Sequence, residues 1–237
     1  MRTERLLPEE AAKLFTDENF LTSSIVLLGG SVVRGEATET SDLDIVVVDD
    51  RVDQAYRESI IAHDWPIEVF VHNRETIYQF FEKDCERARP SLPRMVAEGK
   101  VIKDDGSSKL LKEHALRLLL DGPPEWNEST IGLKRYFLTD LLDDFIGSVL
   151  HAESLFIAGA LATALHEFVL RTNRMWIGSS KWIVRALNDF DQNFADEFVN
   201  CFDCYYRTGD KEPVIKLVDL VLQPYGGRLF HGFSLGK

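Results

Sequence analysis

The fold is constrained most by a change of residue pattern near Gly106. Before that point the chain contains compact apolar runs rich in β-branched residues, at Ser24–Leu28, Leu43–Val48 and Ile67–Val71. Short apolar runs bounded by turn residues predict buried strands. After Gly106, as far as about Gln223, no such run occurs and the apolar residues follow helical spacing. The chain is therefore expected to begin with a small sheet and to continue as helices.

The other segments of the first half complete this α/β pattern. Residues 8–16 have the spacing of a short amphipathic helix, and Val52–His63 also has a helical pattern. Val101 and Ile102 are expected to begin a short edge strand. The first 106 residues should thus combine a small mixed sheet with flanking helices.

The second half has the pattern of a helical bundle. The predicted helices cover residues 107–120, 128–150, 152–174, 180–206 and 211–222. A break is expected near Asp191. The sequence thus predicts an α+β chain of two domains: a catalytic domain over residues 1–106 and a helical, acceptor-binding domain over residues 107–237.

Charge limits the class of partner. The chain has 27 Lys+Arg against 39 Asp+Glu, a formal net charge of −12. Proteins that bind long nucleic acids by their phosphates need dense basic surfaces, so such partners are not expected. An anionic membrane surface is disfavoured for the same reason. A small anionic ligand held together with a metal ion is still compatible with this charge.

The cysteines and the N-terminal residues predict a cytoplasmic protein. Cys201 and Cys204 form a lone C-x-x-C pair, a weak metal or redox signal that is better explained by two thiols one turn apart on a packed helix. No disulfide framework is apparent. The N-terminal residues carry acids where a secretory signal has an apolar core. The apolar run Leu155–Leu165 is too short to span a bilayer.

The segment Leu28–Val48 contains the residues that point to a chemistry. A predicted strand leads into Gly29-Gly30-Ser31, where two glycines permit a tight turn and a close backbone approach to a ligand. Backbone N–H groups at such a turn are suited to phosphate, and Ser31 adds a hydroxyl. Gly29 and Gly30 are also compatible with an ordinary turn.

Carboxylates follow at the start of the next strand. Asp42 and Asp44 are two residues apart, so their side chains share one face of that strand. Glu68 interrupts an otherwise apolar strand, and three carboxylates converge if this strand is the neighbour of the first. Oxygen ligands of this kind suit Mg²⁺. The alternatives are a turn or capping role for Asp42 and an exposed surface position for Glu68.

The ordered set Gly29-Gly30-Ser31, Arg34-Gly35 and Ser41-Asp42-Leu43-Asp44 resembles the signature of the nucleotidyltransferase superfamily that includes DNA polymerase beta. The resemblance covers about residues 25–48 and is strongest to the small bacterial branch. The helical second half is similar to the partner domains of aminoglycoside and lincosamide nucleotidyltransferases.

This resemblance implies roles for particular residues. Gly29, Gly30, Ser31, Arg34 and Ser41 are expected to bind the nucleotide. Asp42 and Asp44 are expected to hold two Mg²⁺ ions, with Glu68 completing the metal site or acting as base. Arg34 is equally compatible with an ion pair to a nearby acid such as Glu36 or Glu39.

Two residues of the helical half are weaker candidates. Arg171, Arg174, Lys181 and Arg185 form a basic cluster near a predicted helix break, and Lys181 is expected to reach the triphosphate. The alternative is a solvated helix end. Glu153 is a possible acceptor-site residue or base, in competition with Glu68. His63 and His72 are assigned no role.

The predicted function is Mg²⁺-dependent transfer of a nucleoside monophosphate, by resemblance AMP from ATP, to a hydroxyl of a small-molecule acceptor such as an aminoglycoside. One alternative is nucleotidylation of a protein or RNA, as antitoxin-type nucleotidyltransferases do. Another is a non-catalytic nucleotide-binding regulator on the same fold.

Overall fold

The computed structural model describes residues 5–236. The chain divides into two compact units, Met1–Gly122 and Pro123–Lys237. This division follows α5 (Ser108–Asp121), whose Leu111 and Ala115 belong to the core of the first unit. The domain boundary near residue 106 stays a prediction.

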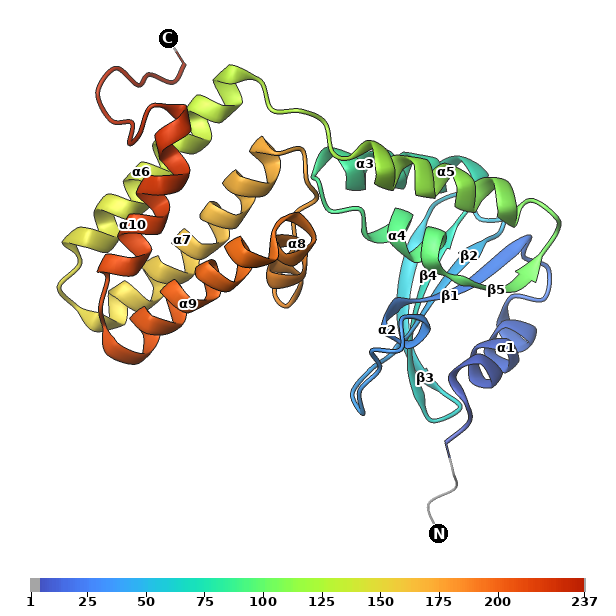
Figure 1. Cartoon of the computed structure of the whole chain (residues 1–237). Coiled ribbons are helices and arrows are strands. Elements are labelled where there is room, and N and C mark those ends of the chain that lie inside the picture. Colours follow the sequence, from blue (N-terminus) through green and yellow to red (C-terminus); the bar gives the residue numbers. More distant parts are fainter. Residues whose placement is uncertain (1–4, 237) are drawn as a thin grey trace. The chain divides into compact units, whose positions relative to one another are not determined.

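A five-stranded mixed sheet forms the centre of the first unit (Figure 1). The strands are β1 (Ile25–Gly29), β2 (Leu43–Val48), β3 (Tyr56–Ala62), β4 (Trp65–His72) and β5 (Lys100–Asp104). They lie in the order β3-β4-β2-β1-β5. Only β2 and β4 are parallel, and their register places Asp44 beside Glu68. The α+β class and the edge position of β5 agree with the sequence-based prediction.

Helices cover both faces of this sheet. The helices of the first unit are α1 (Pro8–Asn19), α2 (Gly30–Val33), α3 (Arg74–Glu86), α4 (Ser91–Glu98) and α5. On one face, α1 buries Phe15 against β-strand residues such as Leu43 and Ile67. On the other, α3, α4 and α5 pack against residues such as Val46 and Val48. Because side chains alternate along a strand, Asp44 and Glu68 lie on this second face.

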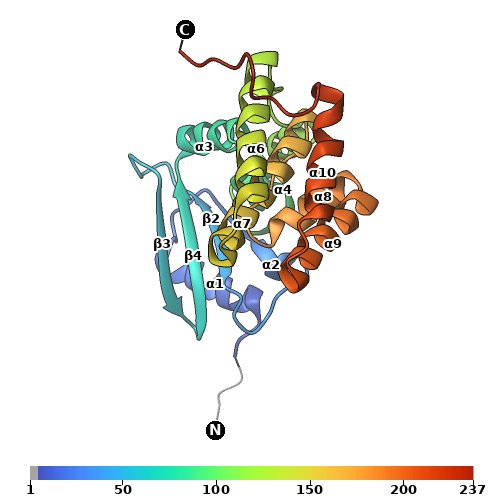
Figure 2. The same ribbon diagram turned by 90° about the vertical axis from the view of Figure 1, so that its left-hand side faces the viewer.

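The helix predicted over Val52–His63 is wrong, because β3 occupies most of that segment. β3 is an edge strand paired antiparallel with β4, and Figure 2 shows the two side by side. His63 and Asp64 both have positive φ, 52° and 62°, and form the two-residue hairpin turn between the strands. Most β3 residues are exposed, so the strand lacks the apolar run that identifies buried strands.

The second unit contains only helices among its described regular elements. They are α6 (Glu128–Gly147), α7 (His151–Thr172), α8 (Trp182–Phe190), α9 (Gln192–Thr208), α10 (Glu212–Leu222) and a short 3₁₀ turn at Gln223–Tyr225. A single apolar core includes Leu142, Leu165 and Tyr205. The predicted break at Asp191 is confirmed, because its side chain accepts a hydrogen bond from the Phe194 amide and caps α9.

α7 is the one described helix with the length and composition to cross a membrane, with a mean hydropathy of 1.4. However, 44% of that apolar window is buried within the protein, and the helix supplies Leu161, Leu165 and Phe168 to the core of the second unit. The apolar core helix of a soluble protein has the same properties, so this is weak evidence for a membrane span.

Candidate functional site

The turn between β1 and α2 has a backbone shape that requires glycine. Gly30 has φ +75°, and a Cβ placed on it would lie 1.9 Å from Oδ2 of Asp44. Gly29 is also close-packed, since its Cβ would lie 3.3 Å from the Cβ of Met95. The Gly30 backbone is thus packed against the Asp44 carboxylate, and the expected approach of this turn to a ligand stays a prediction.

A hydrogen bond between hydroxyl groups joins this turn to the segment that enters β2. Ser31 Oγ donates to Ser41 Oγ at 3.2 Å, and Ser41 Oγ also accepts from the Thr38 amide at 2.8 Å. Ser41 immediately precedes Asp42. The two motif segments that the sequence suggested are thus in direct contact.

Three carboxylates converge next to the turn. Oxygen atoms of Asp42, Asp44 and Glu68 all lie within 4.8 Å of one another, and all three side chains are half-buried. The parallel pairing of β2 with β4 produces this arrangement, because it aligns Asp44 with Glu68 on one sheet face. Among the described residues, this is the one group of His, Cys, Asp and Glu side chains that is suitably placed to hold a metal ion.

The electrostatics of the cluster are those expected of a cation site. Burial, together with the neighbouring Asp42 and Glu68 carboxylates, raises the pKa of Asp44 from 3.8 to about 6, despite opposing effects of Arg34 and Arg57. A cation bound among these oxygens would relieve the repulsion. The donor set is entirely oxygen, which suits a hard divalent cation such as Mg²⁺.

Arg57 is a site residue that the sequence analysis missed. It projects from β3 and forms an ion pair with Glu68, and its guanidinium lies 4.9 Å from the centroid of the Phe70 ring. The β3–β4 register explains the contact, since Arg57 is opposite Phe70 and Ser59 is opposite Glu68. Arg57 was missed because β3 was not predicted as a strand. Once β3 is paired with β4, alternation places Arg57 on the sheet face that carries Glu68.

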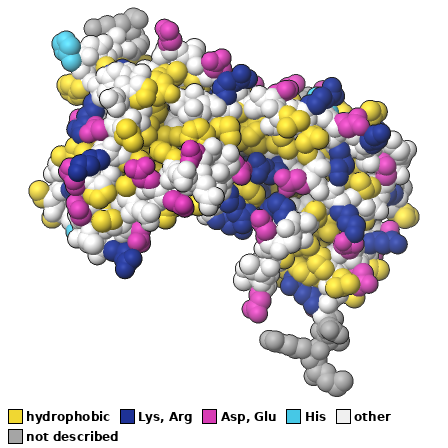
Figure 3. Space-filling view, viewed as in Figure 1, with side chains coloured by type: hydrophobic (Ala, Val, Ile, Leu, Met, Phe, Trp, Pro, Cys, Tyr) yellow, Lys and Arg dark blue, Asp and Glu magenta, His cyan; other side chains and the backbone are white. Residues whose placement is uncertain are grey.

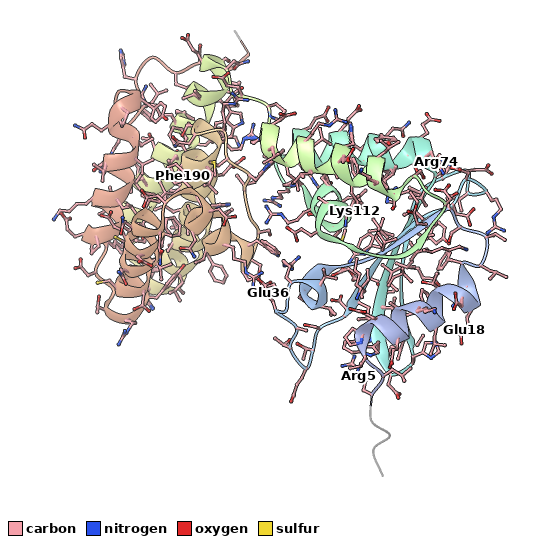
Figure 4. All side chains as sticks on the ribbon, turned by 45° about the vertical axis from the view of Figure 1, so that its right-hand side comes forward. Arg5, Glu18, Glu36, Arg74, Lys112 and Phe190 are labelled. Carbon is pink, nitrogen blue, oxygen red and sulfur yellow. The ribbon has the colours of Figure 1, made fainter. Side chains whose placement is uncertain are left out.

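Arg34 forms the ion pairs that the simpler interpretation anticipated. Its Nε lies 3.2 Å from Glu36 and its Nη1 lies 3.4 Å from Glu98. Glu36 follows α2 and is labelled in Figure 4. Arg34 still acts on the cluster, because its charge opposes the rise in the pKa of Asp44.

The remaining candidates belong to the second unit. Lys181 is exposed and occupies the N-cap position of α8, without a capping hydrogen bond from its side chain. Glu153 is exposed in the first turn of α7. Cys201 and Cys204 lie one turn apart on α9, as expected, and both are half-buried free thiols. The functional roles suggested for Lys181 and Glu153 stay predictions.

One family model and at least one solved structure are similar to this chain. No curated protein matches the sequence. The structure is similar to that of a nucleotidyltransferase-like protein from Exiguobacterium sibiricum, with a TM-score of 0.49 and 10% identity over 91% of this chain and 74% of that one. The family model for the nucleotidyltransferase domain matches residues 11–107, which include the glycine turn and all three carboxylates. The similarity to the nucleotidyltransferase domain family is therefore carried by residues 11–107 of this chain.

Proposed function

We propose that this protein transfers a nucleoside monophosphate, most simply AMP from ATP, to a hydroxyl group of a small molecule. The observation that carries the proposal is the convergence of Asp42, Asp44 and Glu68 beside the Gly30 turn, within a nucleotidyltransferase domain. Degenerate, non-catalytic versions of a site would not be expected to keep three mutually repelling acids in one place.

The residues present are suited to hold Mg²⁺. Asp42, Asp44 and Glu68 would be its protein ligands, and when bound it would neutralise charge on the phosphoryl oxygens. The backbone of the Gly29–Ser31 turn and the Ser31 hydroxyl would contact the triphosphate. In the second unit, Lys181 is proposed to contact the same phosphates, as the resemblance implies.

The reaction conserves atoms and charge in a single displacement. The acceptor oxygen forms a bond to the α-phosphorus, the bond from that phosphorus to the bridging oxygen of pyrophosphate breaks, and pyrophosphate leaves. The hydroxyl proton passes to a carboxylate, for which Glu68 is the first candidate and Glu153 the alternative. Catalysis of this kind depends on positioning and electrostatic stabilisation more than on covalent chemistry.

The first test compares wild-type protein with the double variant Asp42→Asn, Asp44→Asn. Calorimetry measures ATP binding with and without Mg²⁺, and pyrophosphate release is followed against a panel of hydroxyl compounds. We expect Mg²⁺-dependent binding and turnover in the wild type, and loss of both in the double variant with an unchanged circular dichroism spectrum.

Asp17→Asn is a matched control, because Asp17 is an exposed acid on α1, which packs on the opposite face of the sheet. Full Mg²⁺-dependent turnover by the double variant would contradict the mechanism. Tight Mg²⁺-dependent nucleotide binding without pyrophosphate release against any acceptor would favour a regulatory protein. Transfer only to a protein or RNA would favour the antitoxin-type alternative.

A further inference from the structure

A cavity of about 470 Å³ lies beside Asp44 within the first unit. Residues of β3 and β4 form one wall, and residues of α3 and α4 form the other. The apolar side chains that line it are Ala55, Tyr56, Phe70, Phe80, Leu92 and Met95. Its volume is within the range of cavities that enclose small organic ligands.

The charged groups of the cavity are largely paired already. Arg57 is paired with Glu68, and Arg87 is paired with Asp84 at 2.6 Å. Asp84 is buried, and its Oδ2 also accepts a hydrogen bond from the Leu92 amide at 2.8 Å, so it stabilises the start of α4. The residues that line the cavity therefore include two guanidinium groups. Among these lining residues, Asp44 is the one acid without an ion-pair partner.

One polar group in the wall has no partner of its own. His72 is 3% exposed, and its Nδ1 has no hydrogen-bond partner among the described residues. Its ring packs edge-on against Phe80, with centroids 5.0 Å apart. Burial lowers the pKa of His72 to about 4, so the imidazole is neutral near neutral pH. A neutral imidazole in an apolar wall favours an uncharged, hydrogen-bonding ligand over a cationic one.

The position of the cavity relative to the glycine turn distinguishes acceptor from donor. The turn follows β1, on one side of β2, whereas most of the strand residues that line the cavity belong to β4 and β3, on the other side. Asp44 of β2 and Met95, which packs on Gly29, lie between the two. In a phosphoryl or nucleotidyl transfer, the attacking and leaving oxygens are roughly in line across the phosphorus. If pyrophosphate leaves on the side of the turn, the attacking hydroxyl approaches from the side of the cavity.

We infer that this cavity binds the acceptor, and that the acceptor is a small alcohol with a flat apolar body, neutral or anionic rather than polycationic. The inference rests on the proposed function and names its substrate class. The paired acids disfavour an aminoglycoside, because a buried polycation needs unpaired carboxylates around it. The aromatic lining favours an aromatic alcohol. A carboxylate on that alcohol would have to share Arg57 or Arg87 with the acid that each already pairs.

The test uses ligand-observed NMR with naphthalenemethanol, hydroxymethylbenzoate and the aminoglycoside tobramycin, each added to full-length protein. Ala55→Trp fills the cavity from the start of β3, and Phe80→Ala removes part of its wall. We expect at least one aromatic alcohol to bind the wild type, with at least about tenfold weaker binding to Ala55→Trp. Tobramycin should not compete with it.

Two substitutions outside the cavity serve as controls. Ile61→Trp adds the same indole to an exposed position of β3, and Tyr78→Ala removes a ring from α3 at similar exposure, 40% against 38% for Phe80. Both should bind the aromatic alcohol within about twofold of the wild type. Equal binding by Ala55→Trp and wild type, or no binding of either aromatic alcohol, would overturn the inference.

Calorimetry with Mg²⁺ and ATP separates this inference from the proposed function. Ala55→Trp and Phe80→Ala should bind Mg²⁺-ATP within about twofold of the wild type, which also shows that they are folded. If the wild type binds Mg²⁺-ATP normally but the cavity variants bind the aromatic alcohol as well as the wild type does, only the acceptor site is refuted. Absence of Mg²⁺-dependent ATP binding in the wild type refutes the proposed function itself.

Discussion

The backbone of Gly30 and the carboxylate of Asp44 are packed so closely that a methyl group on Gly30 would lie 1.9 Å from Oδ2 of Asp44. The glycine turn therefore does more than permit a phosphate to approach. Because Gly30 has no Cβ, the Asp44 carboxylate can occupy the space beside the turn.

Gly30→Ala should consequently disrupt the acidic cluster. Alanine at this positive φ is strained by roughly 1–2 kcal/mol, and the new methyl group displaces Asp44. We expect Mg²⁺-dependent ATP binding to weaken by at least about tenfold, as measured by calorimetry.

Gly35→Ala separates strain from displacement. Gly35 also has a positive φ, +71°, but a Cβ there would meet nothing within 4 Å. It should lose a similar amount of stability in urea unfolding while binding Mg²⁺-ATP nearly as the wild type does. If both variants bind equally well, the contact between Gly30 and Asp44 has no role in the site.

Asp44→Asn should stabilise the metal-free protein near neutral pH. The pKa of Asp44 rises from 3.8 to about 6 on folding, so its ionisation opposes the folded state. The protonated Asp44 carboxyl contributes fully to the stability of the folded protein below the unfolded-state pKa. This contribution is lost as the pH rises through about 6. Removing the charge should raise the free energy of unfolding at about pH 7.5 by about 1–3 kcal/mol, while abolishing stabilisation by Mg²⁺.

Asp49→Asn provides a control of opposite sign. Asp49 is buried at the end of β2, and its hydrogen bonds to Arg51 hold the pKa of the carboxyl below its usual range. Its ionisation therefore favours folding above the unfolded pKa, and that contribution is lost as the pH falls. Asp49→Asn should lower stability near neutral pH. If Asp44→Asn and Asp49→Asn lowered the free energy of unfolding equally, the repulsion assigned to Asp44 would be contradicted.

The predictable and unpredictable parts of the site differ in physical origin. Asp42, Asp44 and Gly30 were identified because their roles depend on local spacing: alternation along one strand and a tight turn at the end of another. Their convergence with Glu68 required β2 and β4 to be neighbours in the sheet. The order of strands in a sheet depends on contacts between distant segments, which local residue spacing does not determine.

The wrong helix over Val52–His63 and the missed Arg57 share one cause, which is the edge strand β3. Its residues are mostly exposed, so they lack the buried apolar run that identified the central strands. With β3 read as a helix, neither the ion pair of Arg57 with Glu68 nor the cavity wall formed by Tyr56 was foreseeable. α3 and α4, which form the opposite wall, were also not identified.

Arg57→Met should strengthen the binding of Mg²⁺ alone. Arg57 pairs with Glu68 and so competes with a cation for that carboxylate. The pair is partly exposed, with side-chain exposures of 57% and 25%, so it is worth at most about 1 kcal/mol. We therefore expect affinity for Mg²⁺ to rise by about two- to fivefold in a thermal-shift titration without nucleotide.

Arg57→Lys should fall between the wild type and Arg57→Met, because lysine keeps the charge but not the planar guanidinium. A lower Mg²⁺ affinity in Arg57→Met would contradict the competition and would indicate that Arg57 supports the acidic cluster instead.

Lys181→Ala tests whether the second unit contributes to nucleotide binding. Lys181 is exposed at the start of α8 and its side chain makes no capping hydrogen bond, so its removal should leave stability within about 0.5 kcal/mol of the wild type. If its ammonium contacts the triphosphate, Mg²⁺-ATP should bind at least about tenfold more weakly, and the salt dependence of binding should decrease. Lys216→Ala, on α10 in an exposed ion pair with Glu212, controls for the loss of one positive charge in the same unit. Equal ATP affinity in the two variants would exclude Lys181 from the phosphate site and leave the nucleotide to be held by residues of the first unit.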